Sequence, residues 1–177
     1  MPFYFMDFRQ KILDYYAFTE ADYKELTKPL SELPLPDFNA PPDMSKIKER
    51  IFKAIENKEK IIIYGDYDCD GICSTSIMAK TFDKLGYKAS YYIPIRYQDG
   101  YGLNVSNVIK IKNAGFSLII TVDNGISQNE AIDKANELGM DVIVIDHHEE
   151  PETPVNALGI IHPSVSRISD VFGFTWL

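Results

Sequence analysis

The chain has 177 residues, the length of one ordinary domain, and 45% of them are apolar, enough to bury a core. No apolar run reaches the roughly 20 residues of a membrane span, and the N-terminus lacks the layout of a signal peptide. The net charge of −8 argues against a protein that coats nucleic acid with a basic surface. We expect a globular, cytoplasmic protein that uses cations for any phosphate chemistry and does not bind membranes.

The first 44 residues mix aromatic and acidic side chains and then enter a proline-rich run. Because prolines break long helices, residues 1–44 are predicted to form an arm with short helices. The main domain is expected over residues 45–177.

The main domain alternates between helical and strand patterns. Apolar residues at helical spacing predict a helix from Ser45, which can cap its start, to near Asn57. The elements expected next are a strand in "KIIIYGD", a helix over 72–85 that Gly86 ends, a strand over 89–95, a helix after Asn104, a strand over 117–123, a helix that a capping box of Ser127 and Glu130 begins and Gly139 ends, and a strand over 141–146.

The order β-α-β-α-β-α-β predicts an α/β fold with an open, mostly parallel sheet flanked by helices on both faces. Ligands of such folds bind at the carboxyl ends of the strands. The final stretch, residues 166–177, has no pattern that assigns it to a strand or to a tail.

Acidic residues and histidines stand where three of the predicted strands end. Packed carboxylates repel one another unless a cation neutralises them, and oxygen ligands combined with imidazole suit Mn²⁺ or Mg²⁺. Two such ions can bind an activated hydroxide and a phosphate together. The residues are Asp66, Asp68 and Asp70 in the first group, Asp123 in the second, and Asp146, His147 and His148 in the third.

Other interpretations exist for each group alone. Asp123 can be a turn residue and the histidines surface polarity, while the D-x-D-x-D-G pattern also begins an EF-hand calcium loop. Counting Asp66 as position one of that loop puts Ile77 at position twelve, where glutamate is required. The preceding strand also replaces the helix that an EF-hand needs.

Side chains that can contact phosphate flank the acidic groups. Gly71 is expected to turn the chain sharply, and Ser74 and Thr75 then lie in the first turn of a helix whose N–H groups can face a phosphate; they can equally be plain first-turn residues. Arg96 can bind phosphate and Tyr101 can stack on a base, although a solvated Arg96 is the alternative.

The only cysteines, Cys69 and Cys73, are four residues apart beside the predicted metal loop. A disulfide there is disfavoured and zinc lacks partner ligands. We expect reduced thiols.

Four motifs, "YGDYDCDG", "IPIRYQDGYGLN", "TVDNGIS" and "VIDHHE", occur in this order and resemble the DHH phosphoesterases, in particular the single-strand exonucleases of RecJ type. The resemblance implies two divalent ions, usually manganese, and hydrolysis of single-stranded DNA from the 5′ end. By the same resemblance Asp68, Asp70, Asp123 and His147 are metal ligands. Asp66 and Asp146 support them, and His148 and Arg96 engage phosphate.

The chain departs from the family pattern in two places. Tyr64 stands where many relatives carry histidine, and Asp170 is the only late carboxylate and does not match the family's fourth acidic motif. The chain is therefore expected to lack the DHH-associated C-terminal domain that closes the DNA groove.

The leading functional interpretation is a metal-dependent 5′-to-3′ exonuclease core acting on single-stranded DNA, with replication or repair proteins as further partners. One alternative is cleavage of short oligonucleotides or cyclic dinucleotides. Another is a non-catalytic, shortened DHH module that binds a nucleic-acid-processing partner.

Overall fold

The computed structural model describes residues 8–32 and 41–163 of the chain. The chain divides into two compact units, Met1–Pro36 and Asp37–Leu177. The first contains helices α1 (Phe8–Tyr16) and α2 (Glu20–Leu26) and the 3-10 helix η1 (Leu30–Glu32). These are the short helices expected for the arm, while the domain boundary after residue 44 stays a prediction.

The second unit is built on a five-stranded sheet in the order β2-β1-β3-β4-β5, and every neighbouring pair is parallel. The predicted α/β class with an open parallel sheet is therefore confirmed. The strands are β1 (Lys60–Tyr64), β2 (Ser90–Tyr92), β3 (Phe116–Val122), β4 (Asp141–Ile145) and β5 (Gly159–Ile161).

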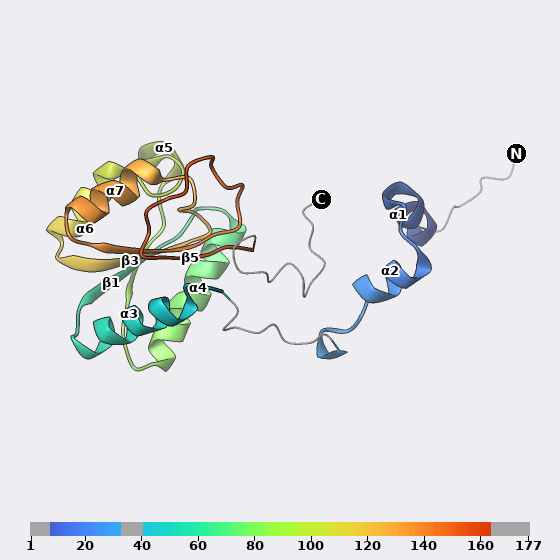
Figure 1. Cartoon of the computed structure of the whole chain (residues 1–177), viewed down its shortest axis with the longest axis horizontal. Helices are drawn as coiled ribbons and strands as arrows, with labels where there is room; N and C mark the ends of the chain where they lie inside the picture. Colours follow the sequence, from blue (N-terminus) through green and yellow to red (C-terminus); the bar gives the residue numbers. More distant parts are fainter. Residues whose placement is uncertain (1–7, 33–40, 164–177) are drawn as a thin grey trace, which may run out of the picture. The chain divides into compact units, whose positions relative to one another are not determined.

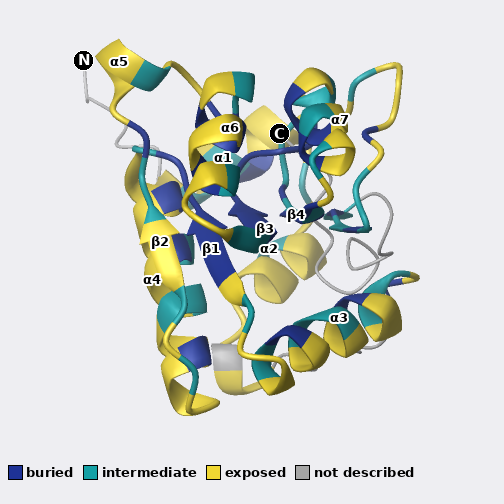
Figure 2. Ribbon diagram, turned by 90° about the vertical axis from the view of Figure 1, so that its left-hand side faces the viewer, coloured by how far each residue is buried: buried dark blue, intermediate teal, exposed yellow. Residues whose placement is uncertain are grey.

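Helices cover both faces of this sheet (Figure 1). One face packs against α3 (Met44–Glu56) and α4 (Cys69–Lys84), and the other against α6 (Val105–Asn113) and α7 (Asn129–Glu137). Figure 2 shows the consequence: β1, β3 and β4 are buried, whereas the helices expose their outer sides.

The apolar runs in the central strands follow from this burial on two faces. In β1, Ile61 and Ile63 join the core under α3 and α4, while Ile62 and Tyr64 join the core under α6 and α7. Because successive strand residues point to opposite faces, a strand covered on both sides reads as a nearly continuous apolar run.

The strand order reverses between β1 and β3. From β1 the chain moves outward to β2, returns to the other side of β1 as β3, and then continues outward to β4 and β5. Open parallel sheets bind their ligands at the carboxyl ends of the strands next to such a reversal. The fold therefore places a site where β1 and β3 end.

Several predicted boundaries are wrong. Helix α4 begins at Cys69, three residues earlier than expected, because Asp68 is its N-cap and accepts a hydrogen bond from Gly71 N–H. The capping box of Ser127 and Glu130 does not form: α7 starts at Asn129, after Gln128, with no side-chain cap.

Two elements were not predicted at all, strand β5 and the short helix α5 (Arg96–Asp99). Among residues 8–32 and 41–163, no helix is both long and apolar enough to cross a membrane. The unassigned C-terminal stretch lies outside the described residues.

Candidate metal centre

The loops that follow β1, β3 and β4 bring their acidic and histidine side chains together. Asp66, Asp68 and Asp123 each offer one oxygen within 4.8 Å of the others, and Asp123, His147 and His148 form a second group under the same limit. Asp123 belongs to both groups. The convergence that the strand ends predict is therefore present in the structure.

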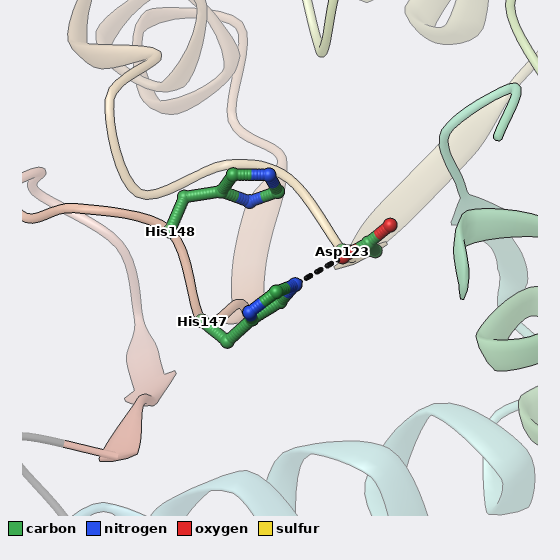
Figure 3. Close-up of side chains that lie close together, drawn as sticks. All are labelled: Asp123, His147 and His148. Carbon is green, nitrogen blue, oxygen red and sulfur yellow. Dashed lines mark hydrogen bonds and ion pairs between the residues drawn. The ribbon is translucent and has the colours of Figure 1, made fainter. Parts of the chain in front are cut away.

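Asp123 and His147 are in direct contact, as Figure 3 shows, with 2.8 Å between His147 Nε2 and Asp123 Oδ1. His147 Nε2 also lies 3.7 Å from Asp70 Oδ2. The His147 imidazole therefore lies between Asp123, at the end of β3, and Asp70, in the first turn of α4.

The backbone at Asp123 is in the left-handed region, with φ of 62°. A non-glycine residue is rarely found there unless its surroundings hold it. Here the Asp123 N–H donates to the Ile145 carbonyl, at 2.9 Å, which ties the end of β3 to the end of β4. The conformation directs the chain sharply away after the strand.

The Asp123 carboxylate is strongly perturbed. Burial, joined by the charge of Asp70, raises its pKa to about 6, although the contact with His147 acts in the opposite direction. A carboxylate that resists ionisation among other carboxylates is what a cation would neutralise.

Asp146 has a different environment, because donors surround both its oxygens. Oδ2 accepts from the Ile126 N–H at 2.9 Å, and Oδ1 accepts from the N–H groups of His147 and His148 at 2.7 and 3.2 Å. Burial raises the pKa of Asp146, but these hydrogen bonds and one from the His148 ring together hold it below its ordinary value. Asp146 is a fixed anion that positions both histidines.

The Asp146 carboxylate also determines the tautomer of His148. His148 Nδ1 lies 2.7 Å from Asp146 Oδ1, so Nδ1 carries a proton and Nε2 points elsewhere. The Tyr101 hydroxyl lies 3.2 Å from Nε2 and 3.3 Å from Nδ1. Burial lowers the pKa of His148, but the bond to Asp146 and the charge of Asp146 outweigh it and raise the pKa.

The loop after β1 is held in place by a close approach at Gly71. A Cβ at Gly71 would lie 2.6 Å from the Asp66 carbonyl oxygen, so only glycine fits beneath that loop. The expected role of Gly71 in a sharp turn is wrong, because the residue lies inside helix α4. Asp66 itself is 1% exposed, and its pKa is raised first by burial and also by the charges of Asp68 and Asp70.

The donor set fits a divalent cation. Among the described residues, Asp66 Oδ1 and Asp123 Oδ2 are buried and have no hydrogen-bond partner. Buried carboxylate oxygens without a proton donor are costly, and carboxylate and imidazole ligands suit Mn²⁺. The residues present therefore match the ion that the sequence predicts.

A pocket of about 340 Å³ opens beside this cluster. The ends of β4 and β5 form an apolar wall, and the other lining residues include Asp70, Ser74, Asp123, His147 and His162. The pocket makes the cluster reachable from solvent.

The residues predicted to contact the substrate strand, besides His148, lie in different environments. Tyr101 borders His148, and the Ser74 hydroxyl donates to the Gly71 carbonyl at 3.1 Å while lining the pocket. The Arg96 guanidinium is 5.4 Å from the centre of the Tyr67 ring, which places it beside the loop of Asp66. Thr75 is buried against Gly65, and its role in phosphate binding stays a prediction.

Asn124 and Tyr64 shape the site although no role was predicted for them from the residues alone. The Asn124 amide donates to the carbonyls of Tyr64 and Val122, at 3.1 and 3.0 Å, and so joins the ends of β1 and β3. The Tyr64 hydroxyl contacts the Gly102 carbonyl and accepts from the Asn107 amide, and burial raises its pKa to about 12. Tyr64 therefore supports the loop of Tyr101 from the core.

The two cysteines lie on the exposed first turns of α4 as free thiols. This agrees with the expectation of reduced thiols beside the loop. Asp170 lies outside the described residues.

Comparison with known proteins places this geometry in a family. The family described as "DHH family, N-terminal domain" matches residues 60–171. The single-stranded-DNA-specific exonuclease RecJ of Bacillus subtilis is 50% identical over 131 residues, which cover 72% of this chain and 16% of that protein. The chain thus spans about a sixth of the length of that relative.

Solved structures give the same result. A crystal structure of exonuclease RecJ bound to manganese is 31% identical, with a TM-score of 0.65, and the match covers 79% of this chain and 34% of that one. RecJ from Thermus thermophilus in complex with Mn²⁺ is 27% identical, with a TM-score of 0.61, over 82% of this chain and 20% of that one. The chain belongs to the DHH family, and over most of its length it is homologous to the RecJ exonucleases.

Proposed function

We propose that this chain carries the metal-binding core of a cytoplasmic hydrolase that cleaves single-stranded DNA from the 5′ end, with two Mn²⁺ or Mg²⁺ ions. The observation that carries the proposal is the pair of ligand groups that share Asp123. A residue common to both groups suits two neighbouring ions. The names of the RecJ relatives support single-stranded DNA as the substrate.

In this proposal Asp68, Asp70, Asp123 and His147 hold the ions, and Asp66 supports them. Bound ions of this kind activate water and neutralise the charge of a phosphate. The chain's own contribution is to gather these ligands from three separate strand ends around the buried Asp123, while Asp68 and Asp70 stay exposed and His147 is half-exposed.

The second contribution is the orientation of His148. Asp146 holds His148 Nδ1 and raises the pKa of the ring, which leaves Nε2 as the ring nitrogen that Asp146 does not contact. We assign Nε2 to contact with a phosphate oxygen or the leaving group. We assign four residues to contact with the substrate strand: Arg96, Ser74, Thr75 and Tyr101. Short oligonucleotides are proposed as further substrates, and replication or repair proteins as further partners.

The test compares purified wild-type chain with Asp123→Asn and the matched control Asp133→Asn. Asp133 is an exposed carboxylate on α7, so both variants lose one charge. With Mn²⁺ and 5′-labelled single-stranded DNA, wild type and Asp133→Asn are expected to release labelled mononucleotides. Asp123→Asn is expected to lose at least 100-fold in rate, since outer-shell changes alone cost 10–100-fold.

Each other outcome has a distinct meaning. Equal rates in wild type and Asp123→Asn identify a contaminating nuclease. Cleavage confined to dinucleotides or cyclic dinucleotides contradicts the exonuclease assignment. Mn²⁺ binding with no cleavage of any of these substrates indicates a binding module.

A further inference from the structure

The segment after β4 carries His147 and His148, and strand β5 runs directly beside it. Ile145 pairs with Ile161 at the end of the two strands, and the Asp146 N–H donates to the Ile161 carbonyl at 3.1 Å. The residue that follows Ile161 is His162. Its side chain therefore starts one position beyond the last pair of the sheet.

His162 is 5% exposed, and both its ring nitrogens contact the segment after β4. Nε2 lies 2.7 Å from the His148 carbonyl oxygen, and Nδ1 lies 2.9 Å from Glu150 Oε1. Since a carbonyl oxygen only accepts, Nε2 carries the proton in the first contact. One ring thus holds the backbone at His148 and the side chain of Glu150.

The held segment is short and has no strand of its own between Asp146 and Glu150. Its inner side is fixed by Asp146, which accepts the N–H groups of His147 and His148. His162 fixes the opposite polar group of His148, its carbonyl. Asp146 and His162 together bind both polar sides of the peptide segment that orients the two imidazoles.

We propose that His162 is a positioning residue, which acts from just after strand β5 through the His148 carbonyl to hold the imidazoles of His147 and His148 toward Asp123. The consequence for metal binding rests on the proposed function. The consequence for the metal-free protein does not, because the contact is internal to the chain.

The test uses two amide variants that differ by one methylene. The glutamine amide in His162→Gln reaches the position of Nε2 and keeps the donor to the His148 carbonyl. The shorter amide in His162→Asn reaches only the position of Nδ1. It therefore keeps the contact with Glu150 and loses the donor to the His148 carbonyl. The pair separates the two contacts of the ring with little change in polarity.

The first readout is amide hydrogen exchange of residues 147–150 in chelator-treated protein. Loss of one buried hydrogen bond is expected to speed exchange there about tenfold in His162→Asn and less than about threefold in His162→Gln. Exchange in helix α3 provides the internal reference. Equal exchange in both variants, whether slow or fast, overturns the proposal.

The second readout is the affinity for Mn²⁺, measured from the electron paramagnetic resonance signal of the unbound ion. His162→Asn is expected to weaken binding about tenfold, and His162→Gln to restore it to within about threefold of wild type. If wild type binds no Mn²⁺, the proposed function fails while the exchange result still decides the role of His162.

Discussion

His147 Nε2 and Asp123 Oδ1 lie 2.8 Å apart, and this contact joins residues from the ends of two neighbouring strands, β4 and β3. The contact couples a buried carboxylate to a half-exposed imidazole. Because of this contact, a change in the charge of Asp123 is expected to affect both the stability of the fold and metal binding.

Replacing Asp123 with asparagine is expected to stabilise the metal-free protein while removing its response to metal. The raised pKa of about 6 means that the ionised carboxylate destabilises the fold at pH 7.5, by about 1–3 kcal/mol. Thermal unfolding with and without Mn²⁺ measures both effects. If Asp123→Asn melts at a lower temperature than Asp133→Asn when both are measured in chelator, the predicted stabilisation is contradicted.

The stability of the metal-free protein is expected to fall as the pH rises from 3.8 to about 6. The folded pKa of Asp123, about 6, is above its ordinary value of 3.8, so its stabilising contribution is complete below pH 3.8 and is lost as the pH rises through 6. The raised pKa of His148 acts in the same direction at higher pH.

The measurement is urea unfolding at several pH values in the presence of chelator. Asp123→Asn is expected to flatten the fall between pH 3.8 and about 6. Stabilisation by Mn²⁺ is expected to grow over the same range, because the ion replaces the proton. A wild-type curve that rises between pH 5 and 7 would show that the burial of Asp123 has little effect.

Asp146→Asn is expected to destabilise the domain by about 2–4 kcal/mol. The carboxylate accepts three backbone N–H groups and the His148 ring, and an amide nitrogen at either oxygen would face a donor with a donor. The pH dependence is opposite to that of Asp123. The lowered pKa of Asp146 stabilises the fold above pH 3.8, and that contribution is lost as the pH falls below 3.8. Urea unfolding at pH 7 checks the size, and a change below 0.5 kcal/mol would refute the role.

Gly71→Ala is expected to cost about 1–3 kcal/mol, because the added methyl group would lie 2.6 Å from the Asp66 carbonyl oxygen. Alanine is otherwise the better helix residue, so helix propensity alone predicts a gain. Ser76→Ala, on the exposed side of the same helix, serves as the control. Chemical denaturation decides between the two predictions, and Mn²⁺ affinity is expected to fall with stability.

The sequence is sufficient to predict the sheet and the grouping of the acidic residues, because both depend on simple repeats. The central strands contain nearly continuous apolar runs, and the carboxylates stand directly after them. Strand β5 was missed because three residues, Gly159–Ile161, are too few to show a period. His162 was missed with it, since the rule that locates polar residues at strand ends needs the strand first.

The geometry inside the loops could not be predicted for a different reason. The left-handed Asp123 and the φ of 118° at Gly125 turn the chain so that Gln128, whose side-chain Oε1 accepts from the Gly125 N–H at 2.7 Å, precedes the helix. Ser127 therefore cannot cap it. Likewise, the need for glycine at position 71 arises from a contact with the Asp66 backbone that only the folded loop creates.

The order of the strands also bears on how the domain resists unfolding. Ligands of the proposed centre come from the ends of β1, β3 and β4, which are adjacent in the sheet but separated by long crossovers in the chain. An ion held by all three would act as a removable cross-link between distant segments, and its release would have to precede separation of the central strands. Chelation would then set the lifetime of the folded sheet, so that protease resistance over hours would report the occupancy of the centre.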